Sequence, residues 1–243
     1  MSDIIVIVPH PDDESALCAG LILRAVKKSH RVRVAFLTSG THGRTLGLVP
    51  QKALAAARRK EAENATRSLG VDDVHFLGYN DFDPRRGKKF AWPDARKKIL
   101  SAAGKISADT VIVSFPPNGI NGHPDHVLCS KLAQEIAEEQ GASLLYVTTN
   151  GAEEAYMMDA ASYLKSQQRR KLHVAASHVL KLTPEEKSGK LFALSHYRTQ
   201  AVSVVDFIRL SKGNLFEEYY TLAPGAGAKA RKLLSGLLRP CRH

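Results

Sequence analysis

Cysteine is scarce in this 243-residue chain, which carries three, at Cys18, Cys129 and Cys241. They are too few and too scattered for a disulfide framework, and no CxxC pair indicates a thiolate zinc site. No stretch approaches the roughly 20 apolar residues that span a bilayer, and no basic leader with a small-residue cleavage site precedes the first apolar run. We therefore expect a cytoplasmic protein with no membrane span.

Acidic residues are outnumbered, with 24 Asp and Glu against 35 Lys and Arg, so the formal net charge is +11. This charge suits an anionic partner such as a phosphorylated sugar, an anionic lipid or a nucleic acid. Glycine-rich phosphate loops are missing, because the first apolar run continues into Pro-Asp-Asp. No nucleic-acid-binding motif is present, so we expect no nucleic acid partner. A non-catalytic domain that binds anionic ligands or nucleic acid is the alternative from another functional class.

Runs of β-branched and apolar residues alternate with helical patterns as far as residue 149. Hydrophobic residues make up 44% of the chain, which is ordinary for a globular protein with a sizeable core. The patterns predict strands over 4–8, 31–37, 74–78, 109–115 and 143–149, and helices over 15–29, 51–69, 94–106 and from about 123. This alternation predicts an α/β fold, Rossmann-like and doubly wound, with a mainly parallel sheet and helices on both faces.

The pattern is weaker beyond residue 150. It predicts a helix over 151–163, a strand within 173–182, and a helix that Thr183 caps and that has Pro at its first position. From about residue 224 the tail is basic, and we expect a frayed or surface-docked helix. No repeat and no linker divides the sequence, so we expect one domain over residues 1–243.

Two clusters of imidazole and carboxylate side chains each follow a predicted buried strand. The first is Pro9-His10-Pro11-Asp12-Asp13-Glu14, and the second is His123-Pro124-Asp125-His126. In a doubly wound sheet these two strands are neighbours, and ligands bind in the crevice at their carboxyl ends. The clusters are therefore expected to meet. Burying the acids without partners is costly, so they either face solvent or hold a cation.

The residue types in these clusters suit a catalytic zinc site. Three ligands of the His and carboxylate type leave a fourth position for water, and His10, Asp13 and His126 can supply that set. Asp12 is then placed to take a proton from the water. A protonated His123 can face the oxygen that becomes negative when the water attacks a carbonyl. Other divalent ions accept the same ligands.

Other polar residues carry weaker signals. Arg44 and His42 lie in a glycine-bearing loop after the second predicted strand and can reach a ligand in the same crevice, although a plain turn explains them equally well. Asp81, after the third strand, can bind substrate hydroxyls or simply face solvent. Asp125 fits a helix N-terminus without any further role.

Taken together, these motifs resemble the PIG-L/LmbE-like family of zinc-dependent N-deacetylases. The two clusters carry most of the resemblance, and four further segments are similar, namely Thr38–Gly43, Arg58–Ala62, Gly78–Asp81 and Lys190–Gln200. The resemblance implies a hydrolase that removes the N-acetyl group from an N-acetylglucosamine-type sugar or glycoconjugate, with zinc activating the attacking water.

The resemblance implies the same zinc ligands and general base as the residues do, and it gives His123 either oxyanion stabilisation or general acid catalysis. It adds Arg58 and Asp81 as contacts to the sugar or its aglycone. Two departures leave the substrate open, because Asn121, at a position implied to bind substrate, replaces a tyrosine of some members, and Thr199 replaces the usual Ser. A thiol-sugar conjugate or a natural-product amide such as an antibiotic precursor is therefore the alternative substrate. Related enzymes are oligomers, so a homo-oligomer is expected.

Overall fold

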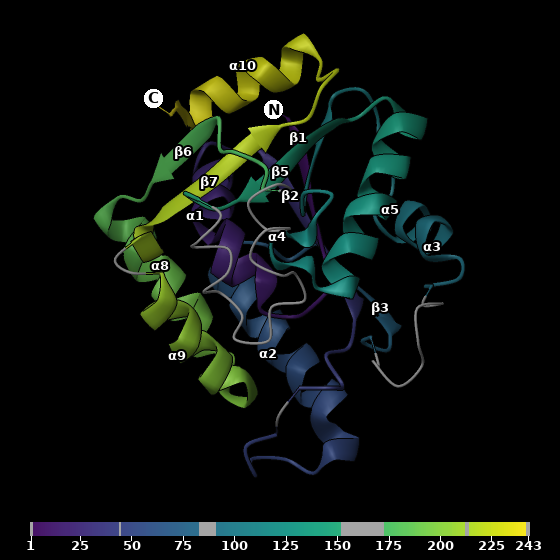
Figure 1. Cartoon of the computed structure of the whole chain (residues 1–243), viewed down its shortest axis with the longest axis vertical. Helices are drawn as coiled ribbons and strands as arrows, with labels where there is room; N and C mark the ends of the chain where they lie inside the picture. The colour runs from purple at the N-terminus through teal and green to yellow at the C-terminus, as the bar shows by residue number, and fades with distance from the viewer. Residues whose placement is uncertain (1, 44, 83–90, 152–172, 212–213, 242–243) are drawn as a thin grey trace.

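The structure is a computed structural model that describes residues 2–43, 45–82, 91–151, 173–211 and 214–241. Within these residues one mixed sheet of eight strands runs through the molecule in the order β3-β2-β1-β4-β5-β7-β6-β8 (Figure 1). Helices pack against both faces of this sheet. The predicted α/β class, with its doubly wound arrangement, is confirmed.

The parallel part of the sheet contains the five strands that the sequence predicts. They are β1 (Asp3–Val8), β2 (Arg31–Thr38), β3 (Val74–Tyr79), β4 (Thr110–Ser114) and β5 (Ser143–Thr148). The strand β1 lies in the middle and pairs in parallel with β2 on one side and with β4 on the other. The two strands that precede the imidazole and carboxylate clusters are therefore neighbours, as predicted.

The remaining strands are antiparallel additions beyond β5. The strand β7 (Glu217–Leu222) pairs with β5, and β6 (His178–Lys181) lies between β7 and the short β8 (Arg239–Pro240). The predicted strand within 173–182 is thus present as β6. The strands β7 and β8 were not predicted from the sequence, so the sheet is wider than expected.

Two apolar layers cover the sheet. Alternate residues of β1 divide between them, because Ile4, Val6 and Val8 belong to one core cluster while Ile5 and Ile7 belong to the other. The first layer is built with α1 (Asp13–Lys27), α2 (Leu54–Ser68) and α8 (Pro184–Ser195), and the second with α3 (Ala95–Ala102) and α5 (Pro124–Gln140). Figure 1 shows these groups on opposite sides of the strands.

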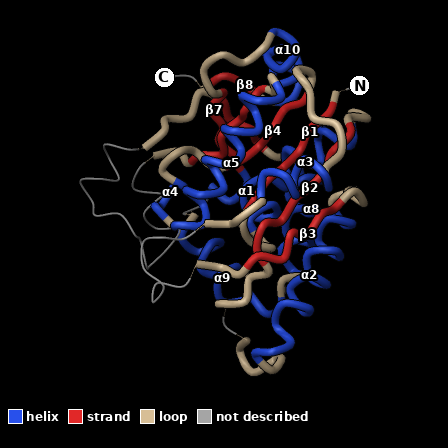
Figure 2. The backbone as a smooth tube through the Cα atoms, turned by 90° about the vertical axis from the view of Figure 1, so that its right-hand side faces the viewer, coloured by secondary structure: helices blue, strands red, loops and turns tan. Residues whose placement is uncertain are grey.

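Further elements complete the described part. They are α4 (Gly119–Gly122), α9 (Ala201–Leu210), α10 (Ala228–Leu237) and the 3-10 turns η1 (Gln51–Ala53), η3 (Arg198–Gln200) and η4 (Asn214–Phe216). Helix α10 buries four residues, and Figure 2 places it at the same end of the molecule as the start of β1. The basic tail is therefore a docked helix. None of the described helices is long and apolar enough to cross a membrane.

Some predicted boundaries differ from the structure. Helix α3 ends at Ala102 instead of 106, because Gly104 adopts a φ of +66°, which breaks the helical path. Helix α8 begins as predicted, with the Thr183 hydroxyl accepting a hydrogen bond from the Glu186 amide in a capping box. The predicted helix over 151–163 falls almost wholly on residues outside the described part.

Candidate metal centre

The two clusters meet at the carboxyl ends of β1 and β4. The chain leaves β1 at Val8 and enters α1 at Asp13, so the first cluster forms the loop between them and the first turn of the helix. The chain leaves β4 at Ser114 and begins α5 at Pro124, so His126 lies in the first turn of α5. Because β1 and β4 are parallel neighbours, both helix starts lie at the same edge of the sheet.

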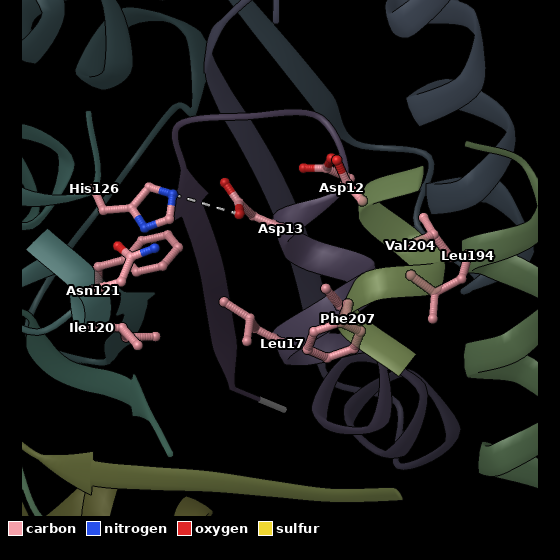
Figure 3. A pocket seen from close by; sticks show the side chains of 12 residues that line it. Asp12, Asp13, Leu17, Ile120, Asn121, His126, Leu194, Val204 and Phe207 are labelled. Carbon is pink, nitrogen blue, oxygen red and sulfur yellow. Dashed lines mark ion pairs between the residues drawn. The ribbon is translucent and has the colours of Figure 1, made fainter. Parts of the chain in front are cut away.

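Three side chains form the candidate metal site predicted from the sequence. One ligand atom from each of His10, Asp13 and His126 lies within 4.8 Å of the other two. The Asp13 carboxylate is central, with Oδ2 3.4 Å from His10 Nδ1 and Oδ1 3.8 Å from His126 Nε2. Figure 3 shows Asp13 and His126 turned toward each other. Two imidazoles and one carboxylate are a donor set that suits zinc and several other divalent ions.

Hydrogen bonds on the far side of each imidazole set its orientation. His126 Nδ1 lies 3.1 Å from the Gly119 carbonyl oxygen, which can accept its proton and so leaves Nε2 as a lone-pair donor toward Asp13. His10 Nε2 lies 3.0 Å from Asp125 Oδ2, which likewise leaves Nδ1 for a metal. Such partners fix the tautomer of a metal-binding histidine.

Asp125 therefore does more than the helix N-terminus position suggested. Its side chain is fully buried, and it accepts hydrogen bonds from the Phe82 amide as well as from His10. It also belongs to a second possible ligand group with His10 and His123. The sequence signal was present, since Asp125 lies between the two histidines of the second cluster, but only the fold shows that it faces His10.

The charges in the cluster favour a cation. Burial would raise the pKa of Asp13, but the His126 and His10 imidazoles outweigh it and hold the pKa at about 2. Burial would lower the pKa of His10, but hydrogen bonds to Asp125 and Asp13 raise it well above its usual value. An ionised acid therefore faces an imidazole that retains a proton, and a metal ion would take the place of that proton.

Asp12 is held in an unusual backbone conformation beside the ligands. Its φ of +132° is rare for a residue other than glycine. Its amide donates to Glu14 Oε2 at 3.2 Å, and its carboxylate accepts a hydrogen bond from Arg58 Nη2 at 3.1 Å. Burial raises the pKa of Asp12 to about 7, although Arg58 acts in the opposite direction. A carboxylate with such a pKa is suited to take up and release a proton near neutral pH.

Glu14 accepts the hydrogen bond from the Asp12 amide and is itself held by two hydroxyls. It is completely buried, and its Oε1 accepts hydrogen bonds from Ser15 Oγ at 2.5 Å and from Tyr197 Oη at 2.6 Å. Tyr197 follows α8, so this bond joins the C-terminal segment that resembles the family to the first cluster. Both residues lie in motifs of the sequence, Pro9–Glu14 and Lys190–Gln200, but neither motif indicates this contact.

His123 is placed as a neutral hydrogen-bond donor in this structure. Burial, together with repulsion from His126 and His10, lowers its pKa to about 2. Its Nδ1 accepts a hydrogen bond from the Asp125 amide at 3.1 Å, so the proton of the neutral ring is on Nε2. The expected protonated form is therefore not the one that this structure favours.

The residues expected to contact substrate have other partners here. Arg58 is 3% exposed, and besides Asp12 it donates to the carbonyl oxygens of Pro11 at 2.5 Å and Gly40 at 3.1 Å. Asp81, also buried, accepts hydrogen bonds from the amides of Gly40 at 2.9 Å and His42 at 2.8 Å. Both side chains hold the loops around the site, and these contacts do not support the expected contact with a sugar.

Asn121 and Arg44 were also predicted to bind substrate, and the structure describes only Asn121. Asn121 is buried, lines a cavity beside the cluster, and accepts a hydrogen bond from the His123 amide at 3.0 Å. Arg44 lies outside the described residues. His42, its alternative in the same loop, is exposed.

The cavity beside the cluster has a volume of about 120 Å³. Figure 3 shows the acids and His126 along one side of it and apolar side chains from several helices around the rest. It is lined by Asp12, Asp13, Ala16, Leu17, Phe115, Ile120, Asn121, His126, Leu194, Ser203, Val204 and Phe207. The candidate metal centre therefore opens into a mainly apolar pocket.

Several known proteins are similar in sequence to this chain. A family model described as "PIG-L: GlcNAc-PI de-N-acetylase" matches residues 5–137, which is more than half of the chain. A probable N-acetyl-alpha-D-glucosaminyl L-malate deacetylase 2 from Bacillus anthracis is 32% identical over 126 residues, which cover 51% of this chain and 54% of that protein. The matched part of the chain thus spans about half the length of that relative.

A second relative matches over nearly its whole length. The 1D-myo-inositol 2-acetamido-2-deoxy-alpha-D-glucopyranoside deacetylase of Saccharomonospora viridis is 27% identical, with 89% of this chain and 93% of that protein covered. Both relatives are named as deacetylases of N-acetylglucosamine-type conjugates, but with different aglycones.

Solved structures show the same fold at low identity. The N,N'-diacetylchitobiose deacetylase of Pyrococcus horikoshii has a TM-score of 0.62 and 22% identity, covering 92% of this chain and 84% of that one. The 4-carboxy-2-hydroxymuconate hydratase GalB of Pseudomonas putida has a TM-score of 0.59 and 15% identity, covering 92% and 96%. Since this fold carries a hydratase as well as deacetylases, the fold alone does not determine the reaction.

Proposed function

Because this chain belongs to the PIG-L family of de-N-acetylases, we propose that it hydrolyses the N-acetyl group of an N-acetylglucosamine-type sugar or glycoconjugate in a metal-dependent reaction. The observation that carries the proposal is the meeting of His10, Asp13 and His126 within 4.8 Å, with the Asp12 carboxylate beside them. Hydrolysis adds water across the amide bond, breaks the bond between carbon and nitrogen, and yields acetate and the free amine.

The donor set fits the cofactor that the family implies. His10 Nδ1, Asp13 and His126 Nε2 would hold a divalent ion, which we propose to be zinc. When bound, the ion would polarise the amide carbonyl and lower the pKa of the attacking water. The hydrogen bonds from His10 to Asp125 and from His126 to the Gly119 carbonyl would keep both imidazoles oriented for this role.

The proton transfers fall to Asp12 in this proposal. Its carboxylate, kept near the reacting atoms by Arg58, takes a proton from the attacking water and later delivers one to the leaving amine. His123 in its neutral form donates its Nε2–H to the oxygen that becomes negative as the tetrahedral intermediate forms. A neutral donor suffices here, so catalysis does not require His123 to be protonated.

The substrate class is inferred from the relatives. They are named for glucosaminyl malate and for glucosaminyl inositol, so we propose a glucosaminide with a small polar aglycone, bound as a small molecule. A thiol-sugar conjugate and a natural-product amide are the substrates to test against it. We also propose that residues 1–243 form one domain that works as a homo-oligomer in the cytoplasm, where its cysteines, free within the described residues, would stay reduced.

The test combines metal content with product release. Purified protein is analysed for bound metal, and acetate is measured from N-acetylglucosamine, its malate and inositol glycosides, and a thiol-sugar conjugate, with and without chelator. We expect about one metal ion per chain and acetate release that the chelator abolishes. Bound metal without release from any of these amides would refute the proposed reaction.

Two variants assign the roles of the residues. Asp12→Asn should keep the metal and lose turnover by about 10²- to 10⁴-fold, as expected for removal of a general base. His126→Ala should lose the metal itself. An Asp12→Asn enzyme with a normal rate would remove Asp12 from the mechanism.

A further inference from the structure

The pocket beside the metal centre is polar at one end and mainly apolar at the other. At one end are the carboxylates of Asp12 and Asp13 and the imidazole of His126. The far wall is apolar, with Leu17 from α1 and Phe207 from α9 among the side chains that Figure 3 shows there. Leu194 and Val204 belong to the same wall, whereas Phe115 stacks on His126 with the ring centroids 4.1 Å apart. The lining is completed by Ala16, Ile120, Asn121 and Ser203.

Only one part of the proposed substrate suits this wall. The reacting carbonyl carbon carries the acyl group on one side and the amine nitrogen of the sugar on the other. The sugar ring bears several hydroxyls, and the two other polar side chains of the lining, Asn121 and Ser203, are too few to pair with all of them, so burying the ring here is costly. An acyl chain has no such groups and is bonded directly to the reacting carbon. The group that extends from the metal centre into this pocket is therefore the acyl chain.

The pocket is larger than an acetyl group requires. A cavity of about 150 Å³ admits benzene, so the volume of about 120 Å³ found here has room for about four or five carbon atoms. The acetyl group offers a single methyl beyond its carbonyl. Ala16, Leu17 and Phe207 also line a second cavity of about 30 Å³, so Phe207 stands between the pocket and additional space.

We propose that this pocket is an acyl-chain site and that the enzyme hydrolyses N-acyl glucosaminides with about four or five carbons beyond the carbonyl in preference to N-acetyl ones. The inference rests on the proposed amide hydrolysis and extends its substrate class. The step is the same hydrolysis, in which water adds, the amide bond breaks, and a fatty carboxylate leaves in place of acetate. Val204 and Phe207 determine the length of chain that fits.

The experiment uses a series of substrates that share one product. N-acetyl-, N-butanoyl-, N-pentanoyl- and N-octanoyl-glucosamine all release glucosamine, so one amine-reactive fluorescent assay measures kcat/KM for each. Each methylene buried should raise kcat/KM about fourfold. We expect a rise of about sixteenfold from acetyl to butanoyl, a maximum near pentanoyl, and a fall at octanoyl, which exceeds the cavity.

Neighbouring valines on α9 provide matched variants. Val204 lines the pocket, whereas the Val205 side chain is 60% exposed and is absent from its lining. Val204→Phe should fill the pocket and lower the ratio of butanoyl to acetyl kcat/KM to about one, while Val205→Phe should keep the ratio of the unmodified enzyme. Phe207→Ala should move the maximum toward longer chains, because it opens the second cavity.

The outcomes separate this inference from the proposed function. Release that is fastest with the acetyl substrate and falls with each added carbon would overturn the acyl-chain site and leave the deacetylase intact. A kcat/KM that does not change with the length of the acyl chain would also overturn it. Bound metal with no amine released from any glucosaminide would overturn both. If Val204→Phe does not fold, the dependence of kcat/KM on acyl-chain length in the unmodified enzyme still tests the proposal.

Discussion

Replacement of Asp125 by Asn tests whether the buried carboxylate orients a metal ligand. The two carboxylate oxygens of Asp125 serve two donors, since His10 Nε2 lies 3.0 Å from Oδ2 and the Phe82 amide lies 3.0 and 3.2 Å from Oδ2 and Oδ1. An asparagine offers one acceptor oxygen and one amide donor. Whichever way the amide turns, a charged acceptor for His10 is lost, and a donor faces His10 or Phe82.

The expected size follows from the role of such partners. A carboxylate that accepts the second proton of a metal-binding imidazole makes that imidazole more basic and holds its ring in place, and losing it typically costs 10- to 100-fold in metal affinity. Asp125→Asn should therefore weaken zinc binding by about 1.4 to 2.7 kcal/mol. Because Asp125 is fully buried, some loss of stability is also expected.

The assay is competition for zinc between the protein and a fluorescent indicator, with thermal unfolding of the metal-free protein measured in parallel. Asp109→Asn is the matched control, because its side chain is 60% exposed, pairs with Lys229 on the surface, and lies at the opposite end of β4. A folded Asp125→Asn protein whose zinc affinity stays within threefold of the unmodified protein would refute the orienting role.

Three further predictions concern the supports of the site. Tyr197→Phe removes a donor to buried Glu14 and should lower the free energy of unfolding by about 1–3 kcal/mol in urea titrations; no change would show that the bond contributes nothing. Removing the ammonium of Lys190, which lies 3.0 Å from the equally buried Glu218, in Lys190→Met should cost about 3 kcal/mol, and a loss below 1 kcal/mol would contradict this. Gly40→Ala should reduce turnover while the metal is retained, because its Cβ would lie 2.0 Å from an Arg58 guanidinium nitrogen; Gly78→Ala, also at positive φ but in open space, is the control, and equal turnover of the two variants would refute the steric argument.

Local sequence patterns were sufficient to predict the parallel half of the sheet and the position of the site. The β-branched run of β1 ends at a proline, and the clusters after β1 and β4 are short and close in sequence to their strands, so the sheet order alone brings them together. The strand β7 was missed, because its first residues are Glu217 and Glu218 and give no apolar alternation. Glu218 can be buried in a strand because Lys190 and two amides of α1 reach it from distant parts of the chain, in addition to the Tyr220 hydroxyl of its own strand.

Contacts between residues far apart in the sequence also explain why the roles of Asp125 and Arg58 could not be assigned from the sequence. A buried acid that orients a histidine and a solvated acid at a helix N-terminus look identical in sequence, and Asp125 was given the second interpretation. The contact of Arg58 with the sugar stays a prediction, whereas its bonds to Pro11, Asp12 and Gly40 join residues 18 to 47 positions away, which the sequence could not indicate. Contacts over such separations depend on the completed fold, whereas a ligand triad depends only on two loops meeting.

The position of the pocket relative to the family match indicates where specificity is determined. All three candidate metal ligands and Asp12 lie inside the matched segment, residues 5–137. Three of the apolar residues that line the pocket, Leu194, Val204 and Phe207, lie beyond it. The proposed hydrolytic chemistry therefore depends on β1, β4 and the helices that follow them, which lie in the segment that matches the family. The size of the acyl group depends on α8 and α9, which family membership does not determine, so the substrate of this enzyme has to be found by varying the acyl chain as well as the aglycone.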